Sequence, residues 1–139
     1  MDARAEAAYD VIIGIGHDLV EIARIERILQ GRTADLFLRR ILTEEEIALA
    51  PAGGRRLAEF AAGRFAVKEA VSKAFGCGIG AAVRFIDIIV LPDRLGKPVC
   101  TLSARAWERL GLDSSATRIH VTITHERGIA SAFAVAERT

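Results

Sequence analysis

Residues 55–75 constrain the fold of this chain more than any other segment. They are rich in alanine, which has the highest helix propensity, and Gly76 follows them as a residue that commonly ends a helix. We therefore expect one long helix there. Residues 129–136 are expected to form a strand in which every second residue is alanine. Because a face of alanines lets another element approach closely, this strand is predicted to pack on the long helix.

The other elements follow from the periodicity of apolar residues. Residues 11–16 are a continuous apolar run that ends in glycine, which is typical of a buried strand. From residue 19 to residue 29 the apolar residues recur at helical spacing, so a helix is predicted there. Further helices are expected at residues 34–41, after Thr43 in a capping box with Glu46, and at 103–110, and further strands at 83–90, 99–102 and 118–124. This order predicts an α+β fold with an antiparallel sheet packed on the long helix.

A single domain is expected from a chain of 139 residues, of which 51% are hydrophobic and 27% charged. We assign the domain to residues 11–139 and treat residues 1–10 as an N-terminal extension. The formal net charge of +1 argues against a protein that grips nucleic acid along its surface. No apolar run is long enough to span a membrane, and residues 1–10 lack the features of a signal peptide. Cys77 and Cys100 are expected to be reduced thiols in a cytoplasmic protein.

The long helix carries an unusual polar arc. At about 100° per residue, Lys68, Glu69, Ser72 and Lys73 fall within about 140° of its circumference. In the ordinary interpretation, Glu69 and Lys73 form an i,i+4 ion pair on a solvated face. The chemical interpretation is that a carboxylate beside two ammonium groups suits a metal ion bound to a phosphate.

A second polar group follows the first predicted strand. Asp18 comes directly after Gly16 and His17, at the expected end of the strand and the start of the next helix. As an ordinary feature it would cap that helix at its N-terminus. Together with Glu69 it would supply two hard oxygen ligands, which is a typical protein contribution to a Mg²⁺ site completed by water and phosphate.

The turn between the last two predicted strands holds Thr124, His125 and Glu126. The ordinary interpretation is a polar turn with an exposed imidazole. Histidine is also the side chain most easily used as an acid, a base or a phosphate donor near neutral pH, so His125 is a candidate site residue. The histidines of the chain show no metal-ligand spacing, which argues against a zinc site.

Four segments, taken in their order and spacing, resemble one known family. They are GIGHDLVEIARIERI, GRFAVKEAVSKAFGCGIG, LGKP and VTITHERGIASAFAV. From Val11 to Glu137 the chain resembles the holo-[acyl-carrier-protein] synthase family, the small class of 4′-phosphopantetheinyl transferases. The most specific part is F-x-x-K-E-A-x-x-K, which ends at Lys73, with Gly16 and Asp18 upstream.

The resemblance implies an enzyme that moves the phosphopantetheine arm of coenzyme A to a serine of apo-acyl carrier protein and releases adenosine 3′,5′-bisphosphate. It also implies a 4′-phosphopantetheinyl transferase-like fold and a homotrimer with active sites between neighbouring chains. Carried over by position, Asp18 and Glu69 would hold Mg²⁺ against the pyrophosphate, and Lys73 would contact the phosphates. The other residues implied to bind coenzyme A are Arg64 and His125 near the nucleotide, Lys68 and Gly76, and Thr124, which with His125 would serve the site of an adjacent chain.

The expected chemistry is phosphoryl transfer, in which positioning and charge neutralisation matter more than covalent help from the protein. Either Glu69 or a water held by the metal could take the serine proton, and the sequence does not choose between them. Larger relatives carry a further acidic ligand two residues after the first aspartate. Because Val20 stands at that place, we expect only two protein carboxylates on the metal. His17 is expected to be a spectator.

The first predicted helix carries a candidate docking patch for the carrier protein, which the resemblance implies is acidic. Arg24 and Arg27 share a face of this helix, and Arg32 follows at its end. The ordinary interpretation is a solvated face on which these arginines pair with Glu21 and Glu26.

A competing function is a trimeric module that binds a nucleotide or a carrier protein without turnover. Such a module would keep the cations that face phosphate but would lack the two metal carboxylates, so the presence of Asp18 and Glu69 favours the enzyme. The sequence leaves open whether the carrier belongs to fatty-acid or polyketide synthesis.

Overall fold

The computed structural model describes residues 11–139, so the predicted N-terminal extension at residues 1–10 lies outside the described residues. The helices and strands of the described part are β1 (Ile12–Glu21), α2 (Ile22–Leu29), α3 (Ala34–Ile41), α4 (Glu44–Leu49), α5 (Gly54–Ala74), β2 (Ile88–Pro92), β3 (Pro98–Leu102), α6 (Ala104–Leu110), β4 (Thr117–Glu126) and β5 (Ile129–Arg138). None of the helices within residues 11–139 is both long enough and apolar enough to cross a bilayer.

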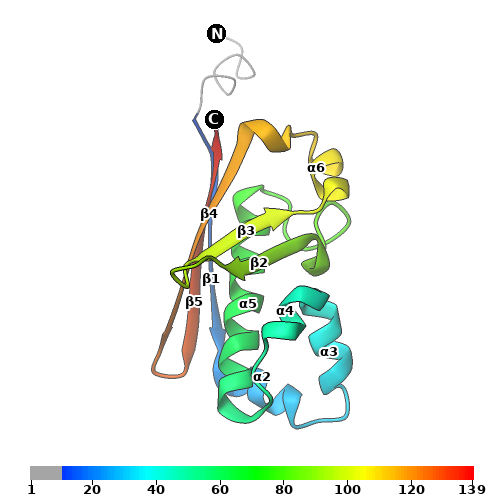
Figure 1. Ribbon diagram of the computed structural model, residues 1–139, viewed down its shortest axis with the longest axis vertical. Helices are drawn as coiled ribbons and strands as arrows, with labels where there is room; N and C mark the ends of the chain where they lie inside the picture. The colour runs from blue at the N-terminus through cyan, green and yellow to red at the C-terminus, as the bar shows by residue number, and fades with distance from the viewer. Residues whose placement is uncertain (1–10) are drawn as a thin grey trace.

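A three-stranded antiparallel sheet and the long helix α5 form the centre of the molecule. The sheet has the strand order β1-β5-β4, while β2 and β3 pair in a separate two-stranded sheet. Helix α5 packs along all three strands of the larger sheet, and α2 packs on α5. In Figure 1 the larger sheet stands edge-on at the left with the helices on its α5 side, and the β2–β3 hairpin, which contacts β4 through β3, is drawn across it. The predicted fold class, an antiparallel sheet packed on a long helix, is confirmed.

The sheet and α5 approach each other closely because small residues line their contact. The alanines of β5 at positions 130, 132, 134 and 136 are all buried. On β1, a Cβ atom added at Gly16 would overlap the carbonyl oxygen of Ala70, and one added at Gly14 would overlap that of Ala74. Only glycine fits at these two positions, since the backbone of β1 rests directly on the backbone of α5. The predicted packing of the alanine-rich strand on the long helix is therefore confirmed.

Strand β1 is longer than the sequence predicts, and this corrects the place of Asp18. The apolar pattern predicts a strand over residues 11–16 and a helix from residue 19, but β1 continues to Glu21 and α2 begins at Ile22. Antiparallel pairing with β5 extends along the whole of β1 and holds this segment in an extended conformation. Asp18 therefore lies inside a strand. The interpretation of Asp18 as the N-cap of the helix is wrong, because Glu21 occupies that position.

The remaining helices agree with the sequence, and one strand is shorter than expected. The capping box is present, with Thr43 N–H donating to Glu46 Oε1 (2.8 Å) and Glu46 N–H donating to Thr43 Oγ1 (3.2 Å). Residues 83–90 were expected to be one strand, but a short 3-10 turn precedes β2. The turn forms because the carboxylate of Asp87 accepts a hydrogen bond from the backbone N–H of Arg84 (2.9 Å).

The face of the larger sheet that points away from α5 is not covered by any element within residues 11–139. Ile15 is 65% exposed, Leu19 60% and Phe133 47%. The ring of His17 stacks on Phe133 with 4.1 Å between the ring centroids. Exposed apolar side chains gathered on one face commonly mark an interaction surface.

Candidate active site

The close contact between β1 and α5 brings together residues that are far apart in the sequence. Lys73 Nζ donates to Asp18 Oδ1 (3.0 Å) and to the backbone carbonyl of His17 (3.1 Å). Asp18 is mostly shielded, with 18% of its side chain exposed, whereas Lys73 is half exposed. The glycines of β1 make this meeting possible, because a larger residue at Gly16 would hold the strand away from the helix.

Glu69 completes a group of two carboxylates and one ammonium. Partial burial raises the pKa of Glu69, and the negative charge of Asp18 raises it further, while Lys73 opposes the shift. The two carboxylates therefore repel each other, and a bound proton or a cation relieves that repulsion. Two hard oxygen donors with open sides suit a divalent cation that keeps water and phosphate ligands.

No group of three or more metal-ligating side chains is found in the part of the chain that the structure describes. Asp18 and Glu69 remain the two carboxylates that could hold a cation beside Lys73. Val20, two residues after Asp18 on the same strand, is 4% exposed and belongs to the apolar core.

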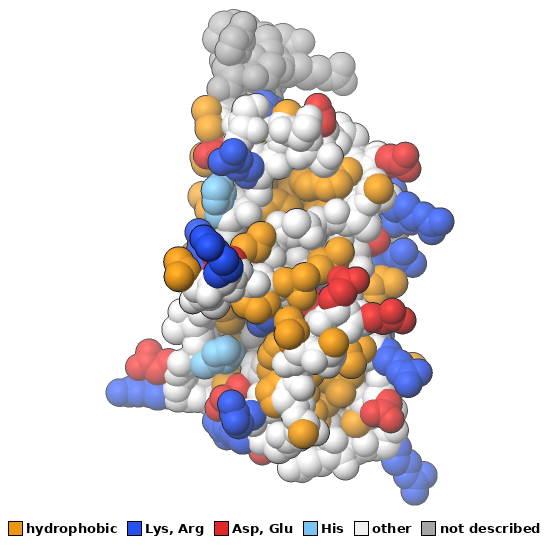
Figure 2. Space-filling view, viewed as in Figure 1, with side chains coloured by type: hydrophobic (Ala, Val, Ile, Leu, Met, Phe, Trp, Pro, Cys, Tyr) orange, Lys and Arg blue, Asp and Glu red, His pale blue; other side chains and the backbone are white. Residues whose placement is uncertain are grey.

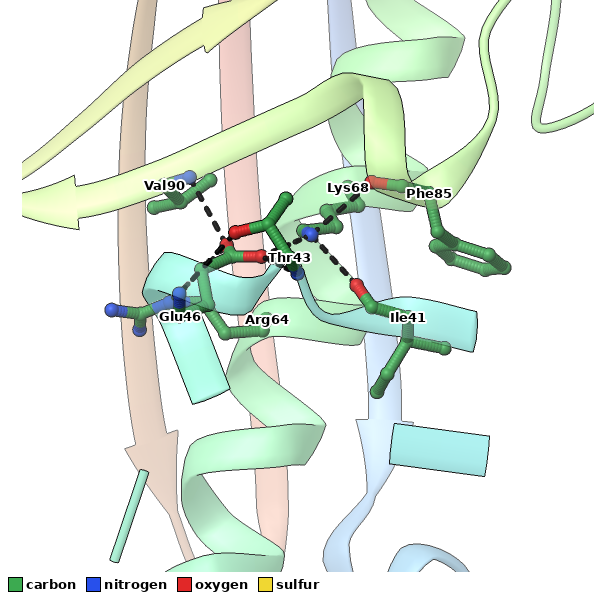
Figure 3. A network of polar contacts seen from close by, with 7 residues as sticks. All are labelled: Ile41, Thr43, Glu46, Arg64, Lys68, Phe85 and Val90. Atoms are coloured by element: carbon green, nitrogen blue, oxygen red, sulfur yellow. Dashed lines mark hydrogen bonds and ion pairs between the residues drawn. The ribbon is translucent and has the colours of Figure 1, made fainter. Parts of the chain in front are cut away.

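Lys68 does not lie on the exposed polar arc that the helical spacing predicts. Its side chain is completely buried, and its amine donates to Glu46 Oε1 (2.6 Å), the carbonyl of Ile41 (2.6 Å) and the carbonyl of Phe85 (3.1 Å) (Figure 3). All three protons are used inside the protein, so the prediction that Lys68 contacts coenzyme A is wrong. Lys68 is buried because the end of α3 and the turn before β2 pack over this side of α5.

Arg64 lies on α5, and its guanidinium has an ion-pair partner but an Nε without a hydrogen bond. Only 14% of its side chain is exposed, and its Nε lies 4.0 Å from Glu46 Oε2 without a hydrogen-bond partner. Its Cζ lies 4.5 Å from the centroid of the Phe60 ring. Burial lowers the pKa of Arg64, and the charge of Glu46 opposes that shift. A guanidinium whose N–H groups are not all hydrogen-bonded can still bind an anion.

His125 lies at the end of β4 and is held against α5. Its Nε2 donates to the backbone carbonyl of Glu59 (3.0 Å), and a Cβ atom added at Gly63 would lie 2.9 Å from the same nitrogen. Thr124, its neighbour on β4, is exposed on the opposite face of the strand. The interpretation of His125 as part of a free polar turn is wrong, because β4 continues through it to Glu126.

The predicted site residues therefore form two groups on one chain. Arg64 and Lys73 are nine positions apart on α5, which places them about 13.5 Å apart along the axis and on opposite sides of the helix. The group at Asp18 includes Glu69 and Lys73. His125 is assigned to the Arg64 group because it contacts Glu59 and Gly63, which lie within five residues of Arg64 on α5. The structure does not bring the two groups together within one chain.

Gly76 ends α5 in the expected manner. Its φ of +74° is the left-handed conformation that favours glycine, and its N–H donates to the carbonyl of Lys73 (2.9 Å). Gly76 is exposed and follows Lys73 closely in space. The backbone of Gly76 therefore lies close to Lys73, a member of the group at Asp18.

The three arginines of the predicted docking patch are all exposed on or after α2. They do not pair with Glu26 as the ordinary interpretation expects, because Glu26 lies 3.8 Å from Arg55 instead. On the face seen in Figure 2, basic and acidic side chains are interspersed and not gathered by sign. Attraction for an acidic partner would therefore depend on a local patch such as Arg24, Arg27 and Arg32.

Glu46 is a residue of this region that the sequence did not indicate as anything more than a helix cap. Its role in the Thr43 capping box accounts for it locally. Nothing in the sequence connects it to Lys68, which is 22 positions away.

Comparison with known proteins gives a consistent result. A family model described as the 4′-phosphopantetheinyl transferase superfamily matches residues 14–134. The chain is 44% identical over 128 residues to a holo-[acyl-carrier-protein] synthase of Bacillus cereus, covering 91% of this chain and 97% of that protein. A crystal structure of a holo-(acyl-carrier-protein) synthase from Bacillus anthracis in complex with CoA (3′,5′-ADP) has a TM-score of 0.78, with 43% identity over 94% of this chain and 100% of that one. The Helicobacter pylori holo-[acyl-carrier-protein] synthase in complex with coenzyme A has a TM-score of 0.76, with 36% identity over 88% and 99% of the two chains.

Proposed function

Because this chain belongs to the 4′-phosphopantetheinyl transferase superfamily, we propose that it transfers the 4′-phosphopantetheine group of coenzyme A to a serine of apo-acyl carrier protein. Adenosine 3′,5′-bisphosphate is the second product. The observation that carries this proposal is the meeting of Asp18 and Lys73, from β1 and α5, beside Glu69. A chain that only bound its ligands would not need two carboxylates beside a phosphate-binding amine.

Asp18 and Glu69 would hold a Mg²⁺ ion, which would neutralise negative charge on the pyrophosphate and on the departing phosphate. Lys73 uses two of its three protons on Asp18 and on the His17 carbonyl, so one proton remains for a phosphate oxygen. The serine oxygen attacks the β-phosphorus, and the bond from that phosphorus to the bridging oxygen breaks. The serine proton would pass to Glu69 or to a water held by the metal.

The active chain is proposed to be a homotrimer with its sites between neighbouring chains. Support comes from the uncovered apolar face at Ile15, Leu19 and Phe133. Further support comes from Arg64 and Lys73, which point to opposite sides of α5 and would meet one coenzyme only if a second chain supplied one of them. In that arrangement Arg64, Thr124 and His125 serve a neighbour's site. Light scattering on an active preparation should give three times the monomer mass, and a monomer mass would contradict the shared site.

The carrier protein is proposed to dock on α2 through Arg24, Arg27 and Arg32, beside the strand that carries Asp18. The two cysteines are free thiols, which fits a reducing compartment, and we propose the cytoplasm as the place of action.

The proposed reaction is tested by incubation with coenzyme A, Mg²⁺ and an apo-acyl carrier protein, followed by intact mass of the carrier. A gain of one phosphopantetheine group is expected. A carrier that binds but keeps its mass would favour the competing function, a binding module without turnover.

A further inference from the structure

Glu46 lies on α4 with no exposed surface, yet its carboxylate joins three elements. Its Oε1 accepts hydrogen bonds from the Thr43 N–H (2.8 Å) and from Lys68 Nζ (2.6 Å). Its Oε2 accepts from the Val90 N–H (3.0 Å) and lies 4.0 Å from Arg64 Nε. Figure 3 shows the carboxylate between α4, α5 and β2, with the two cations on different sides of it. One buried carboxylate thus faces two positive charges.

The two cations are not satisfied equally. Lys68 also donates to the carbonyls of Ile41 and Phe85, so its hydrogen-bonding capacity is full. Arg64 Nε is buried and has no hydrogen-bond partner, the one such side-chain atom within residues 11–139. One negative charge against two positive charges leaves an excess of one positive charge in this cluster, and the open hydrogen-bonding capacity lies on Arg64.

Two groups of this chain lie against the Arg64 guanidinium. The ring of Phe60 lies beside it, 4.5 Å from centroid to Cζ, and Glu46 Oε2 faces its Nε. Figure 3 shows its two terminal nitrogens pointing away from the pair formed by Glu46 and Lys68. Because a guanidinium is planar, an Nε that faces Glu46 directs the terminal nitrogens away from the buried pair.

We propose that Glu46 is a positioning residue for coenzyme binding, which holds Arg64 so that its terminal nitrogens meet a phosphate group of coenzyme A. This inference rests on the function proposed above. Arginine binds phosphate through two parallel hydrogen bonds, so its affinity depends on orientation, and a side chain already held in place loses less entropy on binding. Glu46 touches neither the coenzyme nor the reacting atoms and acts through Arg64.

A double-mutant cycle on Glu46 and Arg64 tests the proposal. The variants are Glu46→Gln, Arg64→Gln and the two combined, and the readouts are calorimetric affinity for 3′,5′-ADP and the kinetics of transfer. Arg64→Gln should weaken 3′,5′-ADP by about 10- to 100-fold, the loss of charge-assisted hydrogen bonds. Glu46→Gln should weaken it by about 3- to 10-fold in the wild-type background and by less than about 2-fold when Arg64 is already replaced.

The kinetic constants KM and kcat should also distinguish binding from catalysis. Glu46→Gln should raise KM for coenzyme A and change kcat by less than about 2-fold, because it removes binding that the ground state and the transition state share. Lys68→Met is the matched control, since it also damages the buried cluster but leaves Glu46 opposite Arg64. It should lower stability and leave the affinity for 3′,5′-ADP within about 2-fold of wild type.

The proposal is overturned if Glu46→Gln weakens 3′,5′-ADP equally in both backgrounds, or if Lys68→Met weakens it as much as Glu46→Gln does. It is also overturned if Arg64→Gln binds as tightly as wild type, a result that leaves the proposed function intact so long as the wild type transfers. If Glu46→Gln does not fold, Glu46→Asp replaces it in the cycle, and failure of both to fold shows a purely structural role. A wild-type chain that neither binds 3′,5′-ADP nor modifies a carrier contradicts the proposed function itself.

Discussion

Two lysines of α5, five positions apart, form ion pairs of opposite character. Lys68 meets Glu46 at 2.6 Å, and neither side chain has any exposed surface. Lys73 meets Asp18 at 3.0 Å, with 49% of the lysine and 18% of the aspartate exposed. Both lysines belong to the same sequence motif, and both pair with a carboxylate from outside their helix.

The difference lies in what each pair has left to bind. The amine of Lys68 is saturated by a carboxylate and two carbonyls, so it holds α4, α5 and the segment before β2 together. The pair at Asp18 keeps an open side, a free amine proton and the nearby carboxylate of Glu69. A saturated buried pair is structural, whereas an unsaturated pair at the surface can take a ligand.

The largest expected effect separates the two regions by activity. Asp18→Ala and Glu69→Ala should each lower the transfer rate by at least about 100-fold, because charge stabilisation dominates phosphoryl transfer. The free energy of unfolding in urea should change by less than about 1 kcal/mol, since these groups lie at a partly solvated site. Glu21→Ala, an exposed acid at the end of the same strand, is the control and should turn over normally. Near wild-type turnover of either site variant at low Mg²⁺ would show that its carboxylate is not needed.

The second prediction separates the regions by stability. Lys68→Met should lower the free energy of unfolding by about 3–5 kcal/mol, because it leaves the buried carboxylate of Glu46 without its closest partner. Lys73→Met should cost less than about 1 kcal/mol, as exposed pairs do, while transfer falls. Urea unfolding and transfer rates, corrected for the folded fraction, check both. Equal losses of stability in the two variants would remove the distinction between the pairs.

A third carboxylate, that of Asp87, extends the comparison to the pH dependence of stability. Burial alone would raise the pKa of Asp87, but hydrogen bonds from the Arg84 N–H and from Ser103 Oγ hold that pKa below 3.8 in the folded protein. Asp87 therefore contributes stability at neutral pH that is lost as the pH falls below about 4, through its folded pKa. We expect Asp87→Asn to cost about 1–3 kcal/mol at pH 7 and to flatten the acid side of the stability profile.

The control for this profile is Asp35→Asn, which changes an exposed acid on α3. It should leave the acid side of the curve as steep as in the wild type. A profile of Asp87→Asn parallel to that of the wild type between about pH 5 and pH 3 would show that another group governs acid unfolding.

The smallest expected effect concerns docking. Arg24→Glu should raise KM for the carrier a few-fold at low ionic strength, with a smaller change at high salt and no change in KM for coenzyme A. Arg105→Glu, an equal charge reversal on α6, is the matched control. An unaltered KM for the carrier at low salt would show that the carrier docks elsewhere.

Most of the fold could be predicted because its local signals are strong. Alanine content and Gly76 define α5, the capping box defines the start of α4, and alternation defines β5. The end of β1 could not be predicted, because the apolar residues Leu19, Val20 and Ile22 fit both a helix and a strand. Pairing with β5 decides between them.

The sequence proposed members of the candidate site but gave little information about their arrangement. The motif indicated Asp18, Glu69 and Lys73, and the structure places Asp18 and Lys73 in contact. Glu46 was missed, since its cap to Thr43 explains its position without reference to Lys68. Helical geometry alone places Arg64 and Lys73 on opposite sides of α5. Whether the two residues serve one site depends on how chains assemble.

The sequence by itself determined that a long small-residue helix packs on an alanine-rich strand, and it singled out the family motif with its charged residues. Only the tertiary structure decided which of those charges face solvent. Helical periodicity states which residues share a side of α5, but it contains no information about what covers that side. Helix α4 and the turn before β2 cover the side of Lys68, so that amine is neutralised inside the protein, while β1 leaves the side of Lys73 open.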